Sequence, residues 1–211
     1  MKFSFKQRQE IAMLLKEELI TYKIANKHKK IERVKLDKNL LEEILQELVL
    51  ASHINASKFN ILKLIDFEGI SFDNIKIRDT NFEGTNANID PQKVRNKNLN
   101  NTNLKGLDMS NKSFDNVLVK GANLEDTNAD IDPQKVRDKS LYKTNLKGLD
   151  MSSKSFESVD AESTNLENTG ACITSSTLID ENTILEGCKV EFEEAKKKVK
   201  TLNLRKKEIY L

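Results

Sequence analysis

Few residues of this chain have the types and the spacing that catalysis or metal binding requires. The two histidines, His28 and His53, match no metal-binding or nucleophile motif, and no glycine-rich phosphate loop is present. The two cysteines, Cys172 and Cys188, are too few and too oddly spaced for a disulfide framework or a zinc site. The sequence therefore predicts a protein that is not an enzyme and that holds neither a metal ion nor another cofactor.

The strongest candidate for a binding site is a polar and basic segment that occurs twice. The sequence Asp-Pro-Gln-Lys-Val-Arg at 90–95 returns unchanged at 132–137, which is 42 residues later. The candidate side chains are Gln92, Lys93, Arg95, Lys97, Gln134, Lys135, Arg137 and Lys139. Because loops that project from a rigid scaffold usually carry binding, two stacked copies would suit a repeated or acidic partner surface. In the alternative interpretation, proline only stiffens an enlarged corner and the two copies record a tandem duplication.

The elements that must position these segments are marked by an apolar residue at every fifth position. The centres of the fives are Phe67, Phe72, Ile77, Phe82, Ala87, Val94, Leu99, Leu104, Met109, Phe114, Val119, Leu124, Ala129, Val136, Leu141, Leu146, Met151, Phe156, Ala161, Leu166 and Ala171. Two of the steps span seven residues, and we assign the two added residues to the Asp-Pro pairs at 90–91 and 132–133. In extended chain alternate residues face the same way, so each centre and the residue two before it point together to one side.

Two further markers give the shape of the repeat. Turn-compatible residues fill the last place of many fives, where they let the chain change direction: Gly69, Asn74, Gly84, Gly106, Asn116, Gly121 and Gly148. Asparagine precedes the centre at separations of 22, 20, 22 and 20, at Asn81, Asn103, Asn123, Asn145 and Asn165. One coil is therefore four fives, with two more residues in alternate coils. Since stacked strands lie about 4.8 Å apart, we expect these asparagines to form a ladder of bonded amides.

These repeats are similar to those of the pentapeptide-repeat family, in which a small residue, Asn or Asp, and Leu or Phe precede two variable positions. The units at 122–126 (Ala-Asn-Leu-Glu-Asp) and 164–168 (Thr-Asn-Leu-Glu-Asn) match this pattern, and the resemblance covers about residues 65–173. It implies a mainly β fold: a right-handed four-sided β-helix solenoid with a filled interior, commonly capped by a helix and sometimes dimeric. One subgroup of the family mimics duplex DNA and binds type II topoisomerases.

Both ends of such a solenoid need covers, because an open coil exposes apolar core and unpaired strand edges. We expect residues 1–64 to form an α-helical N-terminal cap, residues 65–189 the solenoid, and residues 190–211 a short C-terminal helix and tail. Apolar spacing predicts helices near 11–22 and 40–48, joined by a solvated basic connection at 27–35. Leu178 continues the 42-residue rhythm. Because exposed apolar residues at a solenoid end favour self-association, the C-terminal segment would cap, form a homodimer or do both.

The outward residues test the DNA-mimic interpretation, since mimicry needs a continuous negative stripe. On the side that carries Phe72, the residues after the centres are Asp73, Arg95, Asp115, Arg137 and Glu157. On the side that carries Phe82, they are Glu83, Lys105, Glu125, Lys147 and Glu167. Both columns alternate in sign, so neighbours would attract one another and cancel the field. A residual acidic patch consists of Asp66, Asp108, Asp130 and Asp150, interrupted by asparagines.

Composition sets the remaining expectations. The 211 residues are 37% hydrophobic and 32% charged with a net charge of +2, which indicates a thin core with much surface. No apolar run approaches the roughly 18 residues of a membrane span, so we expect a soluble, cytoplasmic protein without a membrane or nucleic-acid partner. The predicted function is a non-enzymatic protein-protein interaction or structural scaffold with an unknown protein partner. The alternative is a DNA mimic that binds or protects a type II topoisomerase (gyrase).

Overall fold

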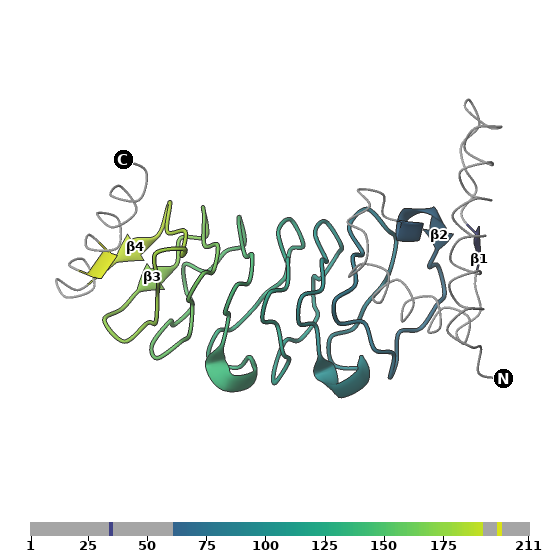
Figure 1. Ribbon diagram of the computed structural model, residues 1–211, viewed down its shortest axis with the longest axis horizontal. Coiled ribbons are helices and arrows are strands. Elements are labelled where there is room, and N and C mark those ends of the chain that lie inside the picture. The colour runs from purple at the N-terminus through teal and green to yellow at the C-terminus, as the bar shows by residue number, and fades with distance from the viewer. Residues whose placement is uncertain (1–33, 36–60, 192–197, 200–211) are drawn as a thin grey trace, which may run out of the picture.

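The chain winds in successive coils along the long axis of the molecule (Figure 1). The computed structural model describes residues 34–35, 61–191 and 198–199. Its regular elements are β1 (Val34–Lys35), the 3₁₀ helix η1 (Ile61–Leu64), β2 (Ile65–Asp66), η2 (Arg95–Lys97), η3 (Arg137–Lys139), β3 (Cys172–Ile173) and β4 (Lys189–Val190). Most of the described chain is therefore extended segments and tight turns, and no helix in this part of the chain is long and apolar enough to cross a membrane.

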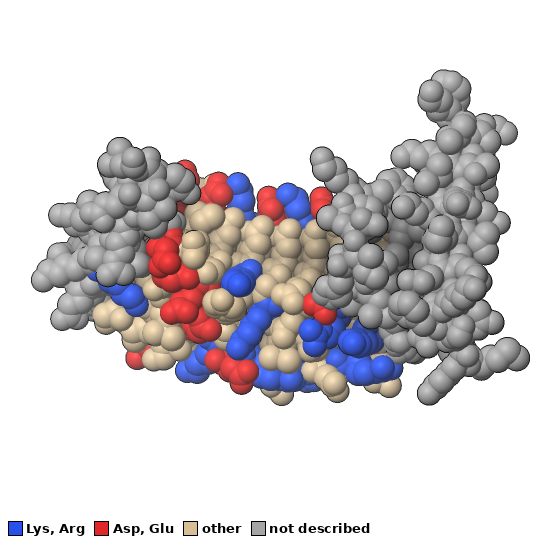
Figure 2. Space-filling model, viewed as in Figure 1, with Lys and Arg blue, Asp and Glu red and all other residues tan. Residues whose placement is uncertain are grey.

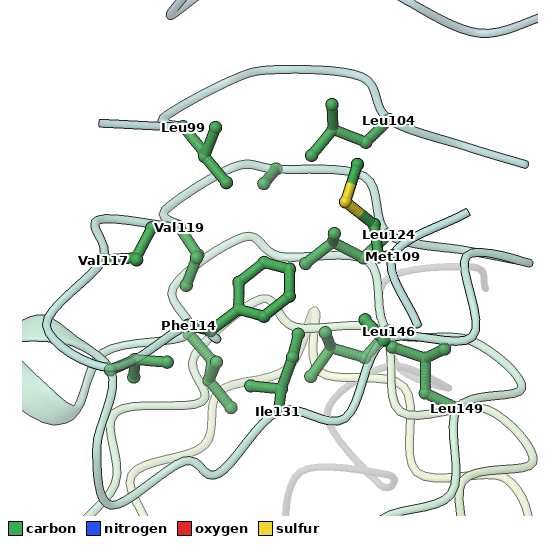
Figure 3. Close-up of a cluster of buried hydrophobic side chains, with 14 of the residues drawn as sticks. Leu99, Leu104, Met109, Phe114, Val117, Val119, Leu124, Ile131, Leu146 and Leu149 are labelled. Atoms are coloured by element: carbon green, nitrogen blue, oxygen red, sulfur yellow. The ribbon is translucent and has the colours of Figure 1, made fainter. Parts of the chain in front are cut away.

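The interior of the coils consists of the residues that the five-residue period predicts. Every predicted centre is buried, and many of the residues two positions earlier are buried as well. Figure 3 shows the side chains of successive segments, among them Leu104, Met109 and Phe114, pointing into the space that the coils enclose. Because burying one such side chain contributes about 1.5–3 kcal/mol, the repeated apolar position is the main stabilising feature of the coils.

The earliest described coil is filled by aromatic rings. The ring centroids of Phe67, Phe72 and Phe82 lie 5.6, 6.1 and 5.5 Å apart in the three pairwise combinations, and two of the pairs meet edge to face. This arrangement is the one that the charge distribution of aromatic rings favours. The cluster closes the core next to η1, whose Leu62 is also buried.

Buried threonines link each coil to the one before it. The Thr102 hydroxyl donates to the carbonyl oxygen of Ile77 at 3.1 Å, and Thr144 and Thr164 make the equivalent bonds at 2.9 and 2.6 Å. A buried hydroxyl without a hydrogen-bond partner would destabilise the fold, and each of these bonds removes that unfavourable free energy of desolvation. The inward position two before a centre therefore accepts Thr as readily as Ala or Val.

The chain turns at the positions that the sequence predicts. All seven predicted turn residues have a positive φ, from 57° at Asn116 to 77° at Gly148. In a typical turn the N–H three residues after a centre donates back to it, as Ile75 does to Phe72 at 3.0 Å. At one corner a side chain would also displace a neighbour, because a Cβ on Gly121 would lie 2.2 Å from the Asn101 side-chain oxygen.

The predicted asparagine column is confirmed at the level of the backbone. Parallel bridges join Asn81 to Asn103, Asn103 to Asn123, Asn123 to Asn145 and Asn145 to Asn165. The side-chain amides of these asparagines, however, form hydrogen bonds with other groups and not with each other. Each side-chain oxygen accepts the backbone N–H two residues later, and the amides of Asn103 and Asn145 donate to a glutamate of the preceding coil at 3.2 and 3.1 Å. The expected ladder of amide to amide bonds is thus replaced by turn-forming and carboxylate bonds.

The extra length of alternate coils lies elsewhere than expected. Ala87 and Ile89 are both buried, and Pro91 is buried as well. The equivalent residues 129, 131 and 133 are buried in the same way. The two added residues therefore lengthen an inward-facing run, so that Ile89 is a further core residue and the Asp-Pro pair belongs to the turn that follows it.

Leu178 departs from the predicted rhythm. It is 50% exposed and bridges Asp160, whereas its neighbours Thr177 and Ile179 are buried. The last coil takes a short turn in which Thr177 donates its N–H to the Thr174 carbonyl at 3.3 Å, without a proline. Ser155 bridges Cys172, so the buried centres of the last coil are Ile173 and Ile179, and Leu178 comes directly before a centre and points outward.

Both ends of the described coils carry additional chain. At the N-terminal end β1 pairs in parallel with β2, so Val34 and Lys35 add a strand to the first coil instead of a solvated connection. The rest of the predicted helical cap at 1–64, apart from η1 and these two residues, lies outside the described residues. At the C-terminal end β3 pairs in parallel with β4, and the Lys198 ammonium donates to the Thr177 carbonyl at 2.9 Å.

Candidate interaction surfaces

The two copies of the predicted binding segment lie on one edge of the coils. In Figure 1 η2 and η3 are the teal and green coiled ribbons at the lower edge. Each follows a buried Val, and each contains residues with positive φ, at 59° and 48° in Asn96 and Lys97 and at 62° and 47° in Asp138 and Lys139. The structure therefore places the predicted segments together, as equivalent projecting loops two coils apart.

The predicted glutamines hold these loops to the next coil. Gln92 donates from Nε2 to the carbonyl oxygens of Ser113 and Asp115 at 3.1 and 2.9 Å, and Gln134 makes the equivalent pair of bonds at 3.2 and 2.8 Å. Gln92 also accepts a hydrogen bond from the Lys97 ammonium. These three side chains are therefore committed to the scaffold.

The predicted arginines bind the preceding coil. Arg95 donates from Nε to the Asn74 carbonyl at 3.0 Å. Arg137 donates to the Asn116 carbonyl at 3.2 and 2.9 Å and to the Asn116 side-chain oxygen at 3.0 Å. It also reaches the Asn96 carbonyl at 3.2 Å, which ties η3 directly to η2. The guanidinium groups thus donate to backbone carbonyls rather than to the described acidic side chains of their column.

The predicted lysines are the part of the site that faces solvent. The side chains of Lys93 and Lys135 are each 60% exposed, with the ammonium 3.7 Å from the aspartate three residues earlier. Lys139 is exposed too. Of the eight predicted residues, these three remain for a partner. The residue types could have predicted which side chains bind the coils and which face solvent. Glutamine and arginine have planar donors suited to carbonyl oxygens, while lysine has a flexible, strongly hydrated ammonium.

The column that follows the Phe82 centres pairs its own charges. Lys105 contacts Glu125 at 2.9 Å, and Lys147 contacts Glu167 at 2.8 Å. The Lys105 hydrogen bond lowers the pKa of Glu125, and the same bond raises the pKa of Lys105. Figure 2 shows the alternation of red and blue along the upper edge of the molecule. This surface is a series of closed ion pairs and offers little net charge to a partner.

The residual acidic patch is divided by local bonds. Asp108 and Asp150 each accept the backbone N–H of the serine two residues later, at 2.9 and 3.0 Å, and serine hydrogen bonds lower the pKa of both carboxyls. Asp130 forms an ion pair with Lys154, and Lys112 donates to the Asn88 side-chain oxygen at 2.9 Å. Two lysines therefore stand within this patch, which interrupts the stripe that DNA mimicry needs.

The cysteines lie at the C-terminal end of the coils. Cys172 is in β3, and the Cys188 thiol is 3.3 Å from the Leu166 carbonyl. Burial raises the pKa of both thiols, so neither is activated as a thiolate. Within residues 61–191 and the other described positions, no three His, Cys, Asp or Glu side chains gather as metal ligands would.

Sequence reasoning missed one surface. The outward residues of the segments centred on Ile77, Leu99, Val119, Leu141 and Ala161 separate by charge along the molecule, with basic residues at the N-terminal end and acidic residues at the other. The signal was present, because these residues flank the predicted centres on one side of every coil. Leu178 and Ile184, the two exposed large hydrophobic residues of the part of the chain that the structure describes, also lie at the acidic end.

No protein-family model matches the chain, and a search of curated proteins finds no match either.

Proposed function

We propose that the coils are a right-handed four-sided β-helix of the pentapeptide-repeat type, and that this solenoid is a non-enzymatic scaffold for a protein partner. The period of five, the burial of every predicted centre and the parallel bridges between residues 20 or 22 apart support the fold. With a core of Leu, Phe and Met side chains, the interior is filled by the chain itself. Function then resides on the outside of the coils.

The observation that carries the proposed function is that some side chains of the η2 and η3 loops bind the coils while others are exposed to solvent. Their glutamines and arginines are bonded to the scaffold, while Lys93 and Lys135 point to solvent from equivalent places and Lys139 is exposed beside Lys135 in the second loop. Loops that are already ordered lose little conformational entropy on binding. Paired lysines on such loops suit an acidic protein surface with two negative groups about 10 Å apart, which is twice the spacing of stacked strands.

The C-terminal segment at 190–211 fits a capping role better than a dimerising one. The Lys198 ammonium bonds the last coil, and Val199 packs against the core. These contacts occupy one end of the solenoid. We therefore propose that the partner binds at the lower edge in Figure 1 rather than at the end.

Affinity capture with a charge-reversal pair tests the proposal. The variant Lys93→Glu with Lys135→Glu alters only the exposed lysines, and Lys143→Glu with Lys189→Glu is the matched control on other sides of the coils. We expect the first variant to lose at least ten-fold in partner recovery, and the control to recover the partner as the wild type does. Recovery should also fall as salt is raised, because the contacts are exposed charges.

Two results would decide against this function. Equal recovery by both variants would make the loops purely structural. Equal recovery of a type II topoisomerase by both would favour the DNA-mimic alternative, and neutralising Asp108, Asp130 and Asp150 would then have to weaken that binding.

A further inference from the structure

One side of the coils has a distribution of charge that differs from the other sides. We call it the Ile77 face, and its outward residues in successive coils are Lys76 and Arg78, Asn98 and Asn100, Leu118 and Lys120, Tyr142 beside the buried Ser140, Asp160 and Glu162, and Leu178 and Asp180. Parallel bridges between Asn98 and Leu118, Ser140 and Asp160, and Asp160 and Leu178 stack these residues. The backbone bond from Gly121 to Tyr142 at 2.8 Å joins the middle coils.

The basic end of this face belongs to the first of these coils. Lys76 and Arg78 are both exposed. The Arg78 guanidinium contacts the adjacent Asp79 at 2.8 Å, and the Arg78 side chain is 45% exposed. Two cationic side chains thus project side by side at the N-terminal end of the Ile77 face.

The acidic end belongs to the last two coils. Asp160, Glu162, Asp180 and Glu181 gather there, and none of them forms an ion pair within the part of the chain that the structure describes. Their hydrogen bonds come from neutral groups: the Ser140 hydroxyl donates to Asp160 at 2.7 Å, and the Ser163 hydroxyl to Asp180 at 2.6 Å.

The Asp180 carboxyl is ionised at neutral pH. Burial by itself would raise its pKa, but hydrogen bonds from Ser163, Thr183 and the Asn182 backbone outweigh burial and lower the pKa to about 2. In Figure 2 the acidic side chains gather toward the left, and Lys and Arg are more frequent at the lower centre and right.

Such segregation is unfavourable in an isolated molecule. Like charges on neighbouring strands repel at the roughly 4.8 Å spacing of stacked strands. The Phe82 column avoids this repulsion by pairing Lys105 with Glu125 and Lys147 with Glu167. The Ile77 face has the opposite arrangement: Arg78 contacts the adjacent Asp79, and the other charged side chains of the face form no ion pair among the described residues, so they can meet a surface with the reverse order of charge.

We propose that this surface is the Ile77 face of a second copy of the chain, packed antiparallel about a two-fold axis. An isologous contact brings the same patch of both copies together. With the axis near Leu118, the first coil of each copy faces the coil of Asp160 and Glu162 in the other. Lys76 and Arg78 then oppose Asp160 and Glu162 twice in one dimer, whereas parallel packing would oppose like charges.

The centre of the face suits the middle of such an interface. Leu118 and Tyr142 are half-buried between the charged ends, and the Lys143 ammonium lies over the Tyr142 ring, 5.1 Å from its centroid. Interfaces commonly have aromatic and apolar residues at the centre and charge at the rim. Because the face is one coil side wide, the buried area falls in the range of small, transient interfaces, and association should be concentration-dependent and sensitive to salt. This dimer uses a different side of the coils from the η2 and η3 loops.

A charge-swap experiment on the full chain tests this proposal. Variant one is Lys76→Glu with Arg78→Glu, which makes both ends of the face acidic. Variant two is Asp160→Lys with Glu162→Lys and Glu181→Lys, which makes both ends basic and leaves Asp180 with its hydrogen bonds. Sedimentation equilibrium at low and at about 0.5 M salt measures the association of each variant, of the wild type and of an equal mixture of the two variants.

We expect the wild type to dimerise at low salt and each variant alone to associate at least ten-fold more weakly. The mixture should restore a heterodimer, because each acidic end then faces a basic one. Restoration also shows that both variants are folded. The control Lys93→Glu with Lys135→Glu should dimerise as the wild type does. A wild type that stays monomeric at low salt, variants that dimerise as well as the wild type, or a mixture without heterodimer would overturn the proposal.

Discussion

Two outward columns of this protein have the same alternation of charge in the sequence and different structures. In the Phe82 column each lysine pairs with a glutamate of the next coil. In the Phe72 column the basic residues are Arg95 and Arg137, which bind backbone carbonyls of the preceding coil. The difference shows that a sign pattern alone does not decide which charges meet.

The reason lies in the length of the chain around each column. The segments of the Phe82 column stack in register, as the bridges from Asn81 to Asn165 show, so equivalent residues lie directly beside one another. In the Phe72 column, Arg95 and Arg137 follow the lengthened inward-facing runs of alternate coils, and these runs shift every second segment. Arg137 therefore lies where carbonyl oxygens are within reach, and Asp115 and Glu157 accept glutamine bonds through their backbone oxygens.

The largest expected effect is that of removing the Arg137 guanidinium. Because hydrogen bonds from a charged donor contribute about 1.5–3 kcal/mol, Arg137→Ala should lower the free energy of unfolding by about 2 kcal/mol. Arg137→Lys should recover only part of this loss, since an ammonium cannot reach all three acceptors. Urea denaturation followed by circular dichroism measures the change. A loss no larger than that of Lys147→Ala would show that the two columns contribute equally.

The next effect concerns the glutamine that holds the η3 loop. Gln134→Ala removes two bonds to carbonyl oxygens and should cost about 1 kcal/mol, because water partly replaces the lost donor. Gln134→Glu has nearly the same volume without the donor, and it should cost as much as alanine. Unfolding midpoints of the two variants provide the comparison, and a neutral Gln134→Glu substitution would contradict the assigned bonds.

A smaller effect is expected in the paired column. Lys147→Ala should cost roughly 0.2–1 kcal/mol, the usual value for a partly exposed ion pair. A double-mutant cycle with Glu167→Ala isolates the coupling, and that coupling should disappear near 1 M salt, where the screening length is about 3 Å. Persistence of the coupling at that salt concentration would place the pair in a less solvated site than its exposure indicates.

The smallest effect is the pH dependence of the same column. The hydrogen bond from Lys105 lowers the folded-state pKa of Glu125, so its stabilising contribution is present above the usual pKa of glutamate and is lost as pH falls through the lowered value. The difference in melting temperature between wild type and Glu125→Gln should therefore shrink as the pH is lowered below about 4. A difference that grows on acidification would reverse the assigned sign.

The sequence predicts the local features of the coils well. The centres, the left-handed turn residues and the stacking of the asparagines are all confirmed, because each depends on a period or on one residue's conformational preference. The prediction is wrong at Leu178, because the last coil lacks the seven-residue step and its buried centres are Ile173 and Ile179. It is also wrong about the amide ladder, since a carboxylate or a backbone N–H competes for the same amide.

The amino-acid sequence by itself determined which side chains fill the interior and where the chain turns, because alternation in extended chain and the tolerance of Gly, Asn and Asp for positive φ are local properties. Only the tertiary structure decided what the outward side chains do. The contacts of these side chains depend on the relative positions of the stacked coils along the long axis. These positions decide whether Arg137 contacts a carboxylate or a carbonyl, and whether the charges of the Ile77 face have a partner within the chain. Those positions depend on the lengths of all the turns that separate one coil from the next.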